Sequence, residues 1–291
     1  LPNPIERLYL SRLGFEGELD FPKFPESLKK IYAGSNFFTG TLDILALPKS
    51  MQRLKISENA LTGTFAVKVS QALDVIFIGE NKLYGTIDFT NLPAVLEEFR
   101  CNHNRFEGTV DLTQLPEQLQ LLYMFSNKFH GDFNITKLPH GMTELTACLN
   151  KFSGTIDLTR LPARFTDLGA RDNELSGTLD LSQLPATMQW LSLGENCFSG
   201  SLDLRYLPDS LRELQLSENK FTGDLRLVDL PKGLRTLFVN ENSLSDTIYI
   251  GNVPGTLDFL GIKGNRFTEV IQNEVSENLS SRTMCFINNI K

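Results

Sequence analysis

The chain has 291 residues, of which 41% are hydrophobic and 22% are charged, and its 28 Lys and Arg against 35 Asp and Glu give a formal net charge of −7. These values are typical of folded globular proteins and exclude the disordered and collagen-like classes. No apolar run approaches the roughly 18 residues that a membrane-spanning helix needs, so we expect no membrane insertion.

The chain is a tandem repeat. Each row reads Leu-Pro-x-x-Leu-x-x-Leu-x-Leu-x-x-Asn-x-Phe-x-Gly-x-Leu-Asp-Leu-x-x, and residues 207–229 show the pattern almost undistorted. Successive rows are offset by 23 residues, with one offset of 22, and ten of the 21 glycines and eleven of the 13 prolines keep a fixed place in the row. Such a period is typical of a solenoid, in which each repeat packs only on its neighbours.

Two alternations in each row predict strands. Leu-x-Leu, as at Leu214 and Leu216, predicts a strand with its leucines inward and the intervening residue outward, and stacked rows should form one parallel sheet. Leu-Asp-Leu predicts a short strand on the opposite, convex side, ended by Leu-Pro because proline lacks a backbone donor. The twelve rows begin at Leu1, Phe24, Leu47, Val69, Leu92, Leu115, Leu138, Leu161, Leu184, Leu207, Leu230 and Val253.

The pattern has irregular places that bear on domain organisation. The chain starts on a row boundary without Met, so we expect that residue 1 is not the natural start. The 22-residue offset falls between Gly63 and Asn81, where Val69-Ser70 replaces Leu-Pro, and predicts a distorted convex side. The sequence predicts one domain of about twelve repeats over residues 1–272, with a C-terminal cap or flexible tail over residues 273–291.

Two buried columns are expected to hold the rows together. The asparagine of each row should enter the interior and bond backbone groups that have no ladder partner, since an unpaired buried polar group costs about 1–3 kcal/mol. The phenylalanine two residues later should fill the core between rows. The asparagine column comprises Asn36, Asn59, Asn81, Asn104, Asn127, Asn150, Asn173, Asn196, Asn219, Asn242 and Asn265. The phenylalanine column comprises Phe15, Phe38, Phe106, Phe129, Phe152, Phe198, Phe221 and Phe267.

The row pattern resembles that of the leucine-rich repeat superfamily over residues 1–272. Its Asn-x-Phe-x-Gly segment is closest to the plant receptor-like and protist subtypes, although this chain has Leu-Asp-Leu where the plant subtype usually has Ile-Pro. The resemblance implies a β-rich solenoid of the α/β class. This would be a right-handed superhelix with a parallel concave sheet of about twelve strands, short extended segments on the convex side and little helix.

No group of residues has the spacing of a catalytic or metal site. His103, His130 and His140 lie in different columns. We expect His103 to lie about 10 Å from Cys148, two strands away, which is beyond the reach that a nucleophile and its base require. The Cys-x-x-Cys, His-Glu-x-x-His and P-loop motifs do not occur. The sequence therefore predicts no enzyme activity, no cofactor and no metal site.

A column of aspartates recurs in the Leu-Asp-Leu segment. Like charges one strand apart repel, so each carboxylate is expected to accept hydrogen bonds that offset this cost. A bound calcium ion is the alternative, because calcium prefers oxygen ligands, but the column is interrupted at Ala66, Arg226 and Tyr249. The aspartate column comprises Asp20, Asp43, Asp88, Asp111, Asp157, Asp180 and Asp203, with Asn134 in the same place.

The outward residues of the concave sheet are the candidate ligand site. Large aromatic side chains on an exposed sheet are typical of interface hot spots, unless they pack laterally on one another. The outward residues of the first six rows are mainly basic and those of the last six mainly acidic, which would orient an elongated partner. The predicted partner-binding residues are Tyr9, Tyr32, Lys55, Phe77, Arg100, Tyr123, Phe125, Trp190, Phe238 and Phe259.

The sequence thus predicts a non-enzymatic module that binds a protein or peptide through the concave sheet. One alternative is the ectodomain of a cell-surface receptor or adhesin that binds peptide or glycan, and another is the recognition half of an enzyme. Nucleic acid is disfavoured, because the net charge is −7 and no continuous basic stripe occurs. The pattern of residues does not define an oligomeric state.

Two features bear on the location of the protein. Secreted proteins of this kind typically have disulfide-bonded caps, so cysteines that lie far apart favour an intracellular location. Two acceptor tripeptides for N-glycosylation, which begin at Asn134 and Asn278, favour an extracellular one. The interpretation leans towards an intracellular location, with the cell surface as the alternative. The cysteines are Cys101, Cys148, Cys197 and Cys285.

Overall fold

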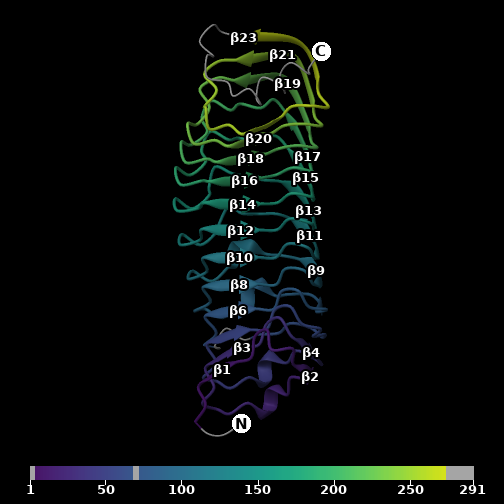
Figure 1. The fold of residues 1–291 in the computed structure, drawn as a ribbon, viewed down its shortest axis with the longest axis vertical. Coiled ribbons are helices and arrows are strands. Elements are labelled where there is room, and N and C mark those ends of the chain that lie inside the picture. The colour runs from purple at the N-terminus through teal and green to yellow at the C-terminus, as the bar shows by residue number, and fades with distance from the viewer. Residues whose placement is uncertain (1–3, 68–71, 273–291) are drawn as a thin grey trace. The chain divides into compact units, whose positions relative to one another are not determined.

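The computed structural model describes residues 4–67 and 72–272 of the chain. The chain divides into two compact units, Leu1–Asp132 with Leu138–Lys151 and Phe133–Lys137 with Phe152–Lys291. Within each unit every row makes one turn of a coil, and the coils lie one above the next (Figure 1). Each unit therefore has the solenoid organisation that the repeat predicts.

The Leu-x-Leu alternation forms the first sheet. The central residue of each strand is apolar and, from Ile31 to Leu260, only 0–3% exposed. Strands of successive rows pair in parallel and in register, as Arg7 pairs with Lys30. The expectation of about twelve parallel strands is confirmed. In the first unit they are β1 (Arg7–Tyr9), β3 (Lys30–Tyr32), β5 (Arg53–Lys55), β6 (Val75–Phe77), β8 (Glu98–Arg100), β10 (Leu121–Tyr123) and β12 (Glu144–Thr146). In the second unit they are β14 (Asp167–Gly169), β16 (Trp190–Ser192), β18 (Glu213–Gln215), β20 (Thr236–Phe238) and β22 (Phe259–Gly261).

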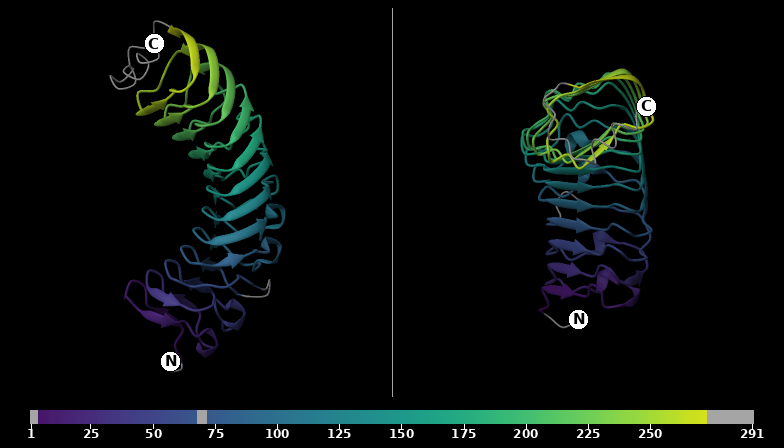
Figure 2. Two further views of the ribbon diagram at one scale, coloured as in Figure 1. Left: turned by 90° about the vertical axis from the view of Figure 1, so that its right-hand side faces the viewer. Right: turned by 45° about the horizontal axis from the view of Figure 1, so that its top comes forward.

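A second set of parallel strands lies on the other side of each coil (Figure 2). These strands cover the Phe-x-Gly segment, so the prediction of a strand over Leu-Asp-Leu is wrong for most rows. In the first unit they are β2 (Glu16–Glu18), β4 (Phe37–Thr39), β7 (Tyr84–Gly85), β9 (Arg105–Thr109) and β11 (Lys128–Asp132). In the second unit they are β13 (Lys151–Thr155), β15 (Glu174–Gly177), β17 (Cys197–Gly200), β19 (Lys220–Leu227), β21 (Ser243–Ile250) and β23 (Arg266–Gln272).

The aspartate column explains why Leu-Asp-Leu is not extended. Asp111 accepts hydrogen bonds from the backbone N of Thr113 at 2.8 Å and from its Oγ1 at 2.6 Å, and such a local turn competes with a strand ladder. In the two rows where Arg226 and Tyr249 replace the aspartate, β19 and β21 continue as paired strands through this segment. An Asp or Asn side chain at this position thus favours the turn, and in the last rows its absence goes with a continued strand.

Short 3-10 helices follow four of these aspartates in the first unit and are seen among its purple and blue coils (Figure 2). They are η1 (Phe21–Lys23), η2 (Ile44–Ala46), η3 (Phe89–Asn91) and η4 (Leu112–Gln114). Over the described ranges the structure has no longer helix, and none that could cross a bilayer. The prediction of little helix is confirmed.

The second set of strands is interrupted where the offset is 22 residues. Between β4 and β7 the only pairing on this side, among the residues described there, is the isolated bridge of Thr41 with Thr62. Leu61 and Leu83 occupy the phenylalanine position here, and both are fully buried. The departure from Leu-Pro at Val69-Ser70 lies outside the described residues.

The phenylalanine column forms the core between the two sets of strands. Its members from Phe38 to Phe221 are 0–6% exposed, and neighbouring rings are stacked, as in Phe198 and Phe221 with centroids 6.4 Å apart. The prediction of a buried side chain is wrong at Phe15, which is 43% exposed, and Phe267 is half-buried. These two belong to the first and last rows of the described structure, where a neighbouring row packs on one side only.

Candidate ligand-binding face

The asparagine column holds the turn that follows each strand of the first sheet. Asn219 shows the pattern: its Oδ1 accepts from the backbone N of Phe198, and its Nδ2 donates to the carbonyls of Leu193, Leu216 and Ser217 at 3.0–3.3 Å. Two of these partners lie in the preceding row and two in its own row. Each asparagine therefore joins two rows and folds the backbone back at the edge of the face.

This turn places the residue before each asparagine, and Arg12 before Leu13 in the first row, in the left-handed region, with φ between 50° and 76°. Only the last of these residues is glycine, so eleven side chains are held in a conformation that most L-residues avoid. The sequence does not predict this conformation, because no Asn-Gly signal marks the position and only the last row has glycine there. The left-handed column comprises Arg12, Ser35, Glu58, Glu80, His103, Ser126, Leu149, Asp172, Glu195, Glu218, Glu241 and Gly264.

Two in-register columns form the outward face of the first sheet in the first unit. The leading column contains the first residue of each strand: Arg7, Lys30, Arg53, Val75, Glu98, Leu121 and Glu144. The trailing column contains the third residue: Tyr9, Tyr32, Lys55, Phe77, Arg100, Tyr123 and Thr146. We call these two columns together the first-unit face.

The trailing column alternates aromatic rings with cations. The rings of Tyr9 and Tyr32 are parallel, with centroids 4.9 Å apart. Lys55 Nζ lies 4.0 Å from the ring centroid of Phe77 and 5.8 Å from that of Tyr32. Lateral packing, one of the two alternatives that the sequence left open, therefore occurs, and it leaves the side chains from Tyr32 to Thr146 half-buried and Tyr9 63% exposed.

Arg100 continues this ladder. Its guanidinium carbon lies 4.4 Å from the ring centroid of Phe77 and 4.7 Å from that of Tyr123, and the hydroxyl of Tyr123 donates to Glu144. The Nε of Arg100 is buried and has no hydrogen-bond partner among the described residues. Burial lowers the pKa of the neighbouring Lys55 ammonium. Contacts of this kind between cations and rings hold both cations in fixed positions.

The leading column is basic at one end. Arg7 pairs with Lys30, and Lys30 with Arg53, so that three cations lie opposite one another on adjacent strands. Of the three, Arg53 forms an ion pair, with its Nε 3.1 Å from Asp74. Like charges directly opposite one another destabilise a sheet, so this arrangement is costly unless an anion neutralises it.

The second unit has a different face, made from β14 to β22. Trp190 is half-buried, Phe259 is 53% exposed and Ser192 is 1% exposed. Phe238 leans over Gly261, because a Cβ at that glycine would lie 2.6 Å from the Phe238 ring. This face therefore has separate aromatic side chains, without the cation ladder of the first unit.

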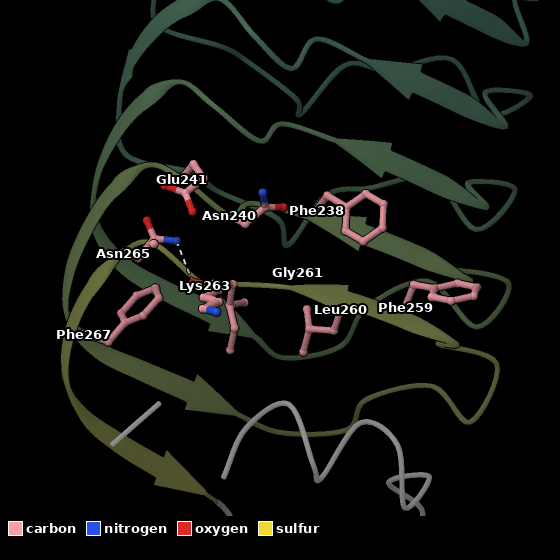
Figure 3. Close-up of a pocket in the computed structure, with 11 residues that line it drawn as sticks. Phe238, Asn240, Glu241, Phe259, Leu260, Gly261, Lys263, Asn265 and Phe267 are labelled. Carbon is pink, nitrogen blue, oxygen red and sulfur yellow. Dashed lines mark hydrogen bonds between the residues drawn. The ribbon is translucent and has the colours of Figure 1, made fainter. Parts of the chain in front are cut away.

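Phe238 and Phe259 line the same pocket, which has a volume of about 600 Å³. Figure 3 shows the two rings on one side of β22, with Asn240, Glu241 and Lys263 further along the same rows. The pocket extends to Leu260 and Phe267, at the last row of the described structure. It brings together two of the predicted partner-binding residues from neighbouring strands.

No protein-family model and no curated protein matches the amino-acid sequence. Solved structures with a similar fold do exist. A TDR receptor matches with a TM-score of 0.71 at 22% identity, over 91% of this chain and 48% of that one. The plant peptide hormone receptor RGFR1 in complex with RGF2 matches with a TM-score of 0.68 at 20% identity, over 90% and 51%. YopM from Yersinia enterocolitica matches with a TM-score of 0.53 at 22% identity, over 95% and 72%.

This chain is a leucine-rich repeat solenoid. The row pattern and the parallel first sheet agree with the resemblance seen in the sequence. The chain spans about half the length of the two receptors, and at these identities the likeness concerns the fold.

The aspartate column of this leucine-rich repeat chain is bonded within its own turns. Oxygens of Asp88, Asp157 and Asp180 accept from the hydroxyl two residues later at 2.6 Å, and hydrogen bonding from that hydroxyl lowers the pKa of each carboxyl. Hydrogen bonds from Arg205 lower the pKa of Asp203 to about 2. These contacts support the structural interpretation of the column over a bound cation.

Asp203 is expected to contribute to acid sensitivity. Its folded-state pKa of about 2 lies below the unfolded value of about 3.9, so its stabilisation is present above pH 4 and is lost as pH falls towards 2. Asp203→Asn should lower the stability near pH 6 slightly and flatten this part of the acid transition. Urea midpoints measured from pH 2 to pH 6 test this.

Asn134 already occupies the aspartate column, and its Oδ1 accepts from Thr136 N and Oγ1 at 3.1 and 2.7 Å. An asparagine at position 203 should therefore keep the turn and remove the titration together with the ion pair to Arg205. The exposed Asp209→Asn is the control, and an unchanged acid transition in Asp203→Asn would contradict the assignment.

Chemically reactive side chains are not gathered in the described structure. Cys101, Cys148 and Cys197 form no disulfide with another described residue, and burial raises the pKa of the Cys101 thiol. Cys285 lies outside the described residues. His103 packs edge-on against Phe125, with ring centroids 4.9 Å apart. Among the residues searched, no three His, Cys, Asp or Glu side chains could together hold a metal ion.

Proposed function

We propose that this protein is a non-catalytic recognition module that binds an extended protein or peptide segment through the outward residues of the first sheet. The observation that carries the proposal is the trailing column, in which six successive strands, β1 to β10, each present an aromatic or a cationic side chain. Aromatic and arginine side chains dominate binding energy at interfaces. Lateral packing restricts their motion, which lowers the entropy lost on binding.

The comparisons support the same class of function. RGFR1 is described as a plant peptide hormone receptor in complex with RGF2, and HAESA as a receptor kinase in complex with the peptide hormone IDA. These proteins share the fold at 20% and 21% identity. A peptide ligand therefore fits this chain better than a nucleic acid, given its net charge of −7.

We further propose that the module functions outside the cell, as part of a receptor or adhesin, which replaces the intracellular interpretation. Two of the solved relatives are described as receptors. Asn134 is exposed, and its Oδ1 is bonded within its own tripeptide, so its Nδ2 is available to carry a glycan. Intact mass of the protein from its native source tests this: a glycan at Asn134 supports it, and a bare mass contradicts it.

The binding function is tested by removing exposed aromatic side chains from the face. Tyr9→Ala in the first unit and Phe259→Ala in the second should each weaken capture of the native partner at least tenfold. The matched controls are Phe37→Ala and Tyr206→Ala, whose side chains are 64% and 59% exposed but lie outside the first sheet. If the controls weaken capture as much as the face variants, the partner binds elsewhere.

A further inference from the structure

We propose that the first-unit face selects one class of segment: an extended chain with two or three clustered acidic residues and, about seven residues from them, a bulky apolar residue. This inference rests on the proposed function and specifies its ligand. It follows from three properties of the first unit, namely a basic patch in which only Arg53 has an ion pair among the described residues, two cations fixed between rings, and an exposed apolar cluster at a set distance.

The basic patch consists of Arg7, Arg12, Lys30, Arg53 and Lys55 on the first three rows. Within the described ranges Arg7, Arg12 and Lys30 form no ion pair, and the pair of Arg53 with Asp74 joins the third row to the fourth. Arg7, Lys30 and Arg53 lie opposite one another on β1, β3 and β5. A carboxylate placed between them would turn repulsion between adjacent strands into attraction.

The two fixed cations extend the basic patch along the trailing column. Lys55 and Arg100 both contact Phe77, at 4.0 and 4.4 Å from its ring centroid, so neither is free to follow a mobile anion. The unpartnered Nε of Arg100 and the desolvated Lys55 ammonium, whose pKa burial lowers, would each gain from an added negative charge. These cations are organised before the ligand arrives, which favours an acidic segment over a neutral one.

The apolar cluster consists of His103, Phe125 and Leu149, beside the ends of β8, β10 and β12. Phe125 packs on His103 and is half-buried, and Leu149 is 48% exposed. Leu149 is also the one aliphatic member of the left-handed column, with φ 57°. Such a conformation costs about 1–2 kcal/mol in a residue with a Cβ. Because Leu149 is also exposed, it does not stabilise the fold more than a polar residue at this position would.

The distance between the patch and the cluster sets the spacing within the ligand. From Lys30 on β3 to Phe125 beside β10 there are four strand steps, or about 19 Å at about 4.8 Å per step. Phe125 also lies four residues beyond Leu121, the residue in register with Lys30, which adds about 13 Å along the strand direction and gives a diagonal separation of about 23 Å. An extended chain advances about 3.3 Å per residue. The acidic residues and the apolar residue should therefore be separated by about seven residues.

The experiment begins with a displayed library of random twelve-residue peptides, selected on the whole protein and counter-selected on the variant Arg7→Glu with Lys30→Glu. The matched charge control is Lys49→Glu with Lys82→Glu, on exposed sites of the same unit outside the first sheet. We expect recovered peptides to carry acidic clusters with an aromatic or leucine about six to eight residues away. Their synthetic forms should bind at least tenfold more weakly to the counter-selection variant and within twofold of normal to the control.

Leu149→Asn separates binding from folding. Asparagine tolerates the left-handed region better than leucine, so this variant should unfold at the same or a higher urea concentration while it binds the selected peptides at least threefold more weakly. Moving the apolar residue to two residues from the acidic cluster should weaken binding by a similar factor.

The outcomes separate the two proposals. If face-dependent peptides are recovered but are not acidic, or keep their affinity when the spacing is shortened, this inference is wrong and the proposed function stands. If no recovered peptide depends on any residue of the first sheet, both fail. If a sulfated polysaccharide such as heparin binds through Arg7 and Lys30 while peptides do not, the basic patch serves a glycan and the inference is overturned.

Discussion

Asn150→Ala should lower the free energy of unfolding by about 3 kcal/mol, because it leaves several buried groups unpaired at about 1–3 kcal/mol each. Its Oδ1 accepts from the backbone N of Phe129, and its Nδ2 donates to the carbonyls of Met124, Ala147 and Cys148, all at 3.1 Å. The residue itself is 8% exposed, so water does not replace these bonds. Urea denaturation measures the loss.

Hydrogen exchange provides a local measurement of the same change. The amide of Phe129 lies on β11 and has the Oδ1 of Asn150 as its acceptor, so its protection should fall more than that of amides two rows away. Asn91→Ala is the control, because Asn91 is exposed and donates to Asp88 at the surface. An Asn150→Ala protein with the stability of this control would show that the column does not hold the rows together.

Gly108→Ala should also lower the free energy of unfolding by about 3 kcal/mol, an effect similar to that of Asn150→Ala. Gly108 has φ 91°, and a Cβ there would lie 2.8 Å from the Cγ2 of Thr86 in the preceding row. The backbone conformation contributes about 1–2 kcal/mol of this cost, and the contact contributes the remainder by forcing two rows apart. Thermal unfolding of the purified variant measures the sum.

Two further variants separate the cost of the backbone conformation from the cost of the contact with Thr86. Gly223→Ala meets the same backbone restriction, with φ 82°, but its nearest neighbour would be the Ser201 Cβ at 3.9 Å, so it should cost about half as much. Thr86→Ala removes the Cγ2 methyl and should restore part of the stability of Gly108→Ala in the double variant. Equal costs for Gly108→Ala and Gly223→Ala would assign the whole effect to backbone conformation.

The sequence predicts the first sheet well because its signal is redundant. Leucines such as Leu214 repeat at a spacing that only a stacked, in-register arrangement can bury, and the asparagines mark where each strand ends. The second set of strands was harder, because Leu-Asp-Leu alternates like a strand while the Asp111 side chain instead bonds the backbone two residues later. Alternation alone does not distinguish a strand from a local turn that a side chain stabilises.

The sequence predicts which residues lie on the candidate binding face, but it does not predict how their side chains contact one another. The repeat spacing places Tyr32, Lys55 and Phe77 on adjacent strands, but it does not predict that the Lys55 ammonium lies over the Phe77 ring. The left-handed column was not detectable either, since Leu149 and Glu195 carry no signal for positive φ. In every row but the first, the asparagine that follows stabilises that conformation through bonds such as Asn150 Nδ2 to the carbonyl of Ala147.

The in-register pairing has a consequence for how such a chain can change over generations. Every bond between neighbouring rows joins positions that recur once per row, as Thr222 pairs with Ser243 and Glu213 with Thr236. Loss or duplication of one whole row inside either unit would therefore reconnect equivalent atoms and leave the scaffold intact. The surface features before the changed row and those after it would move closer together or further apart by one strand step of about 4.8 Å. Such a change would alter the length of the segment that the proposed face can bind, while the fold stays the same.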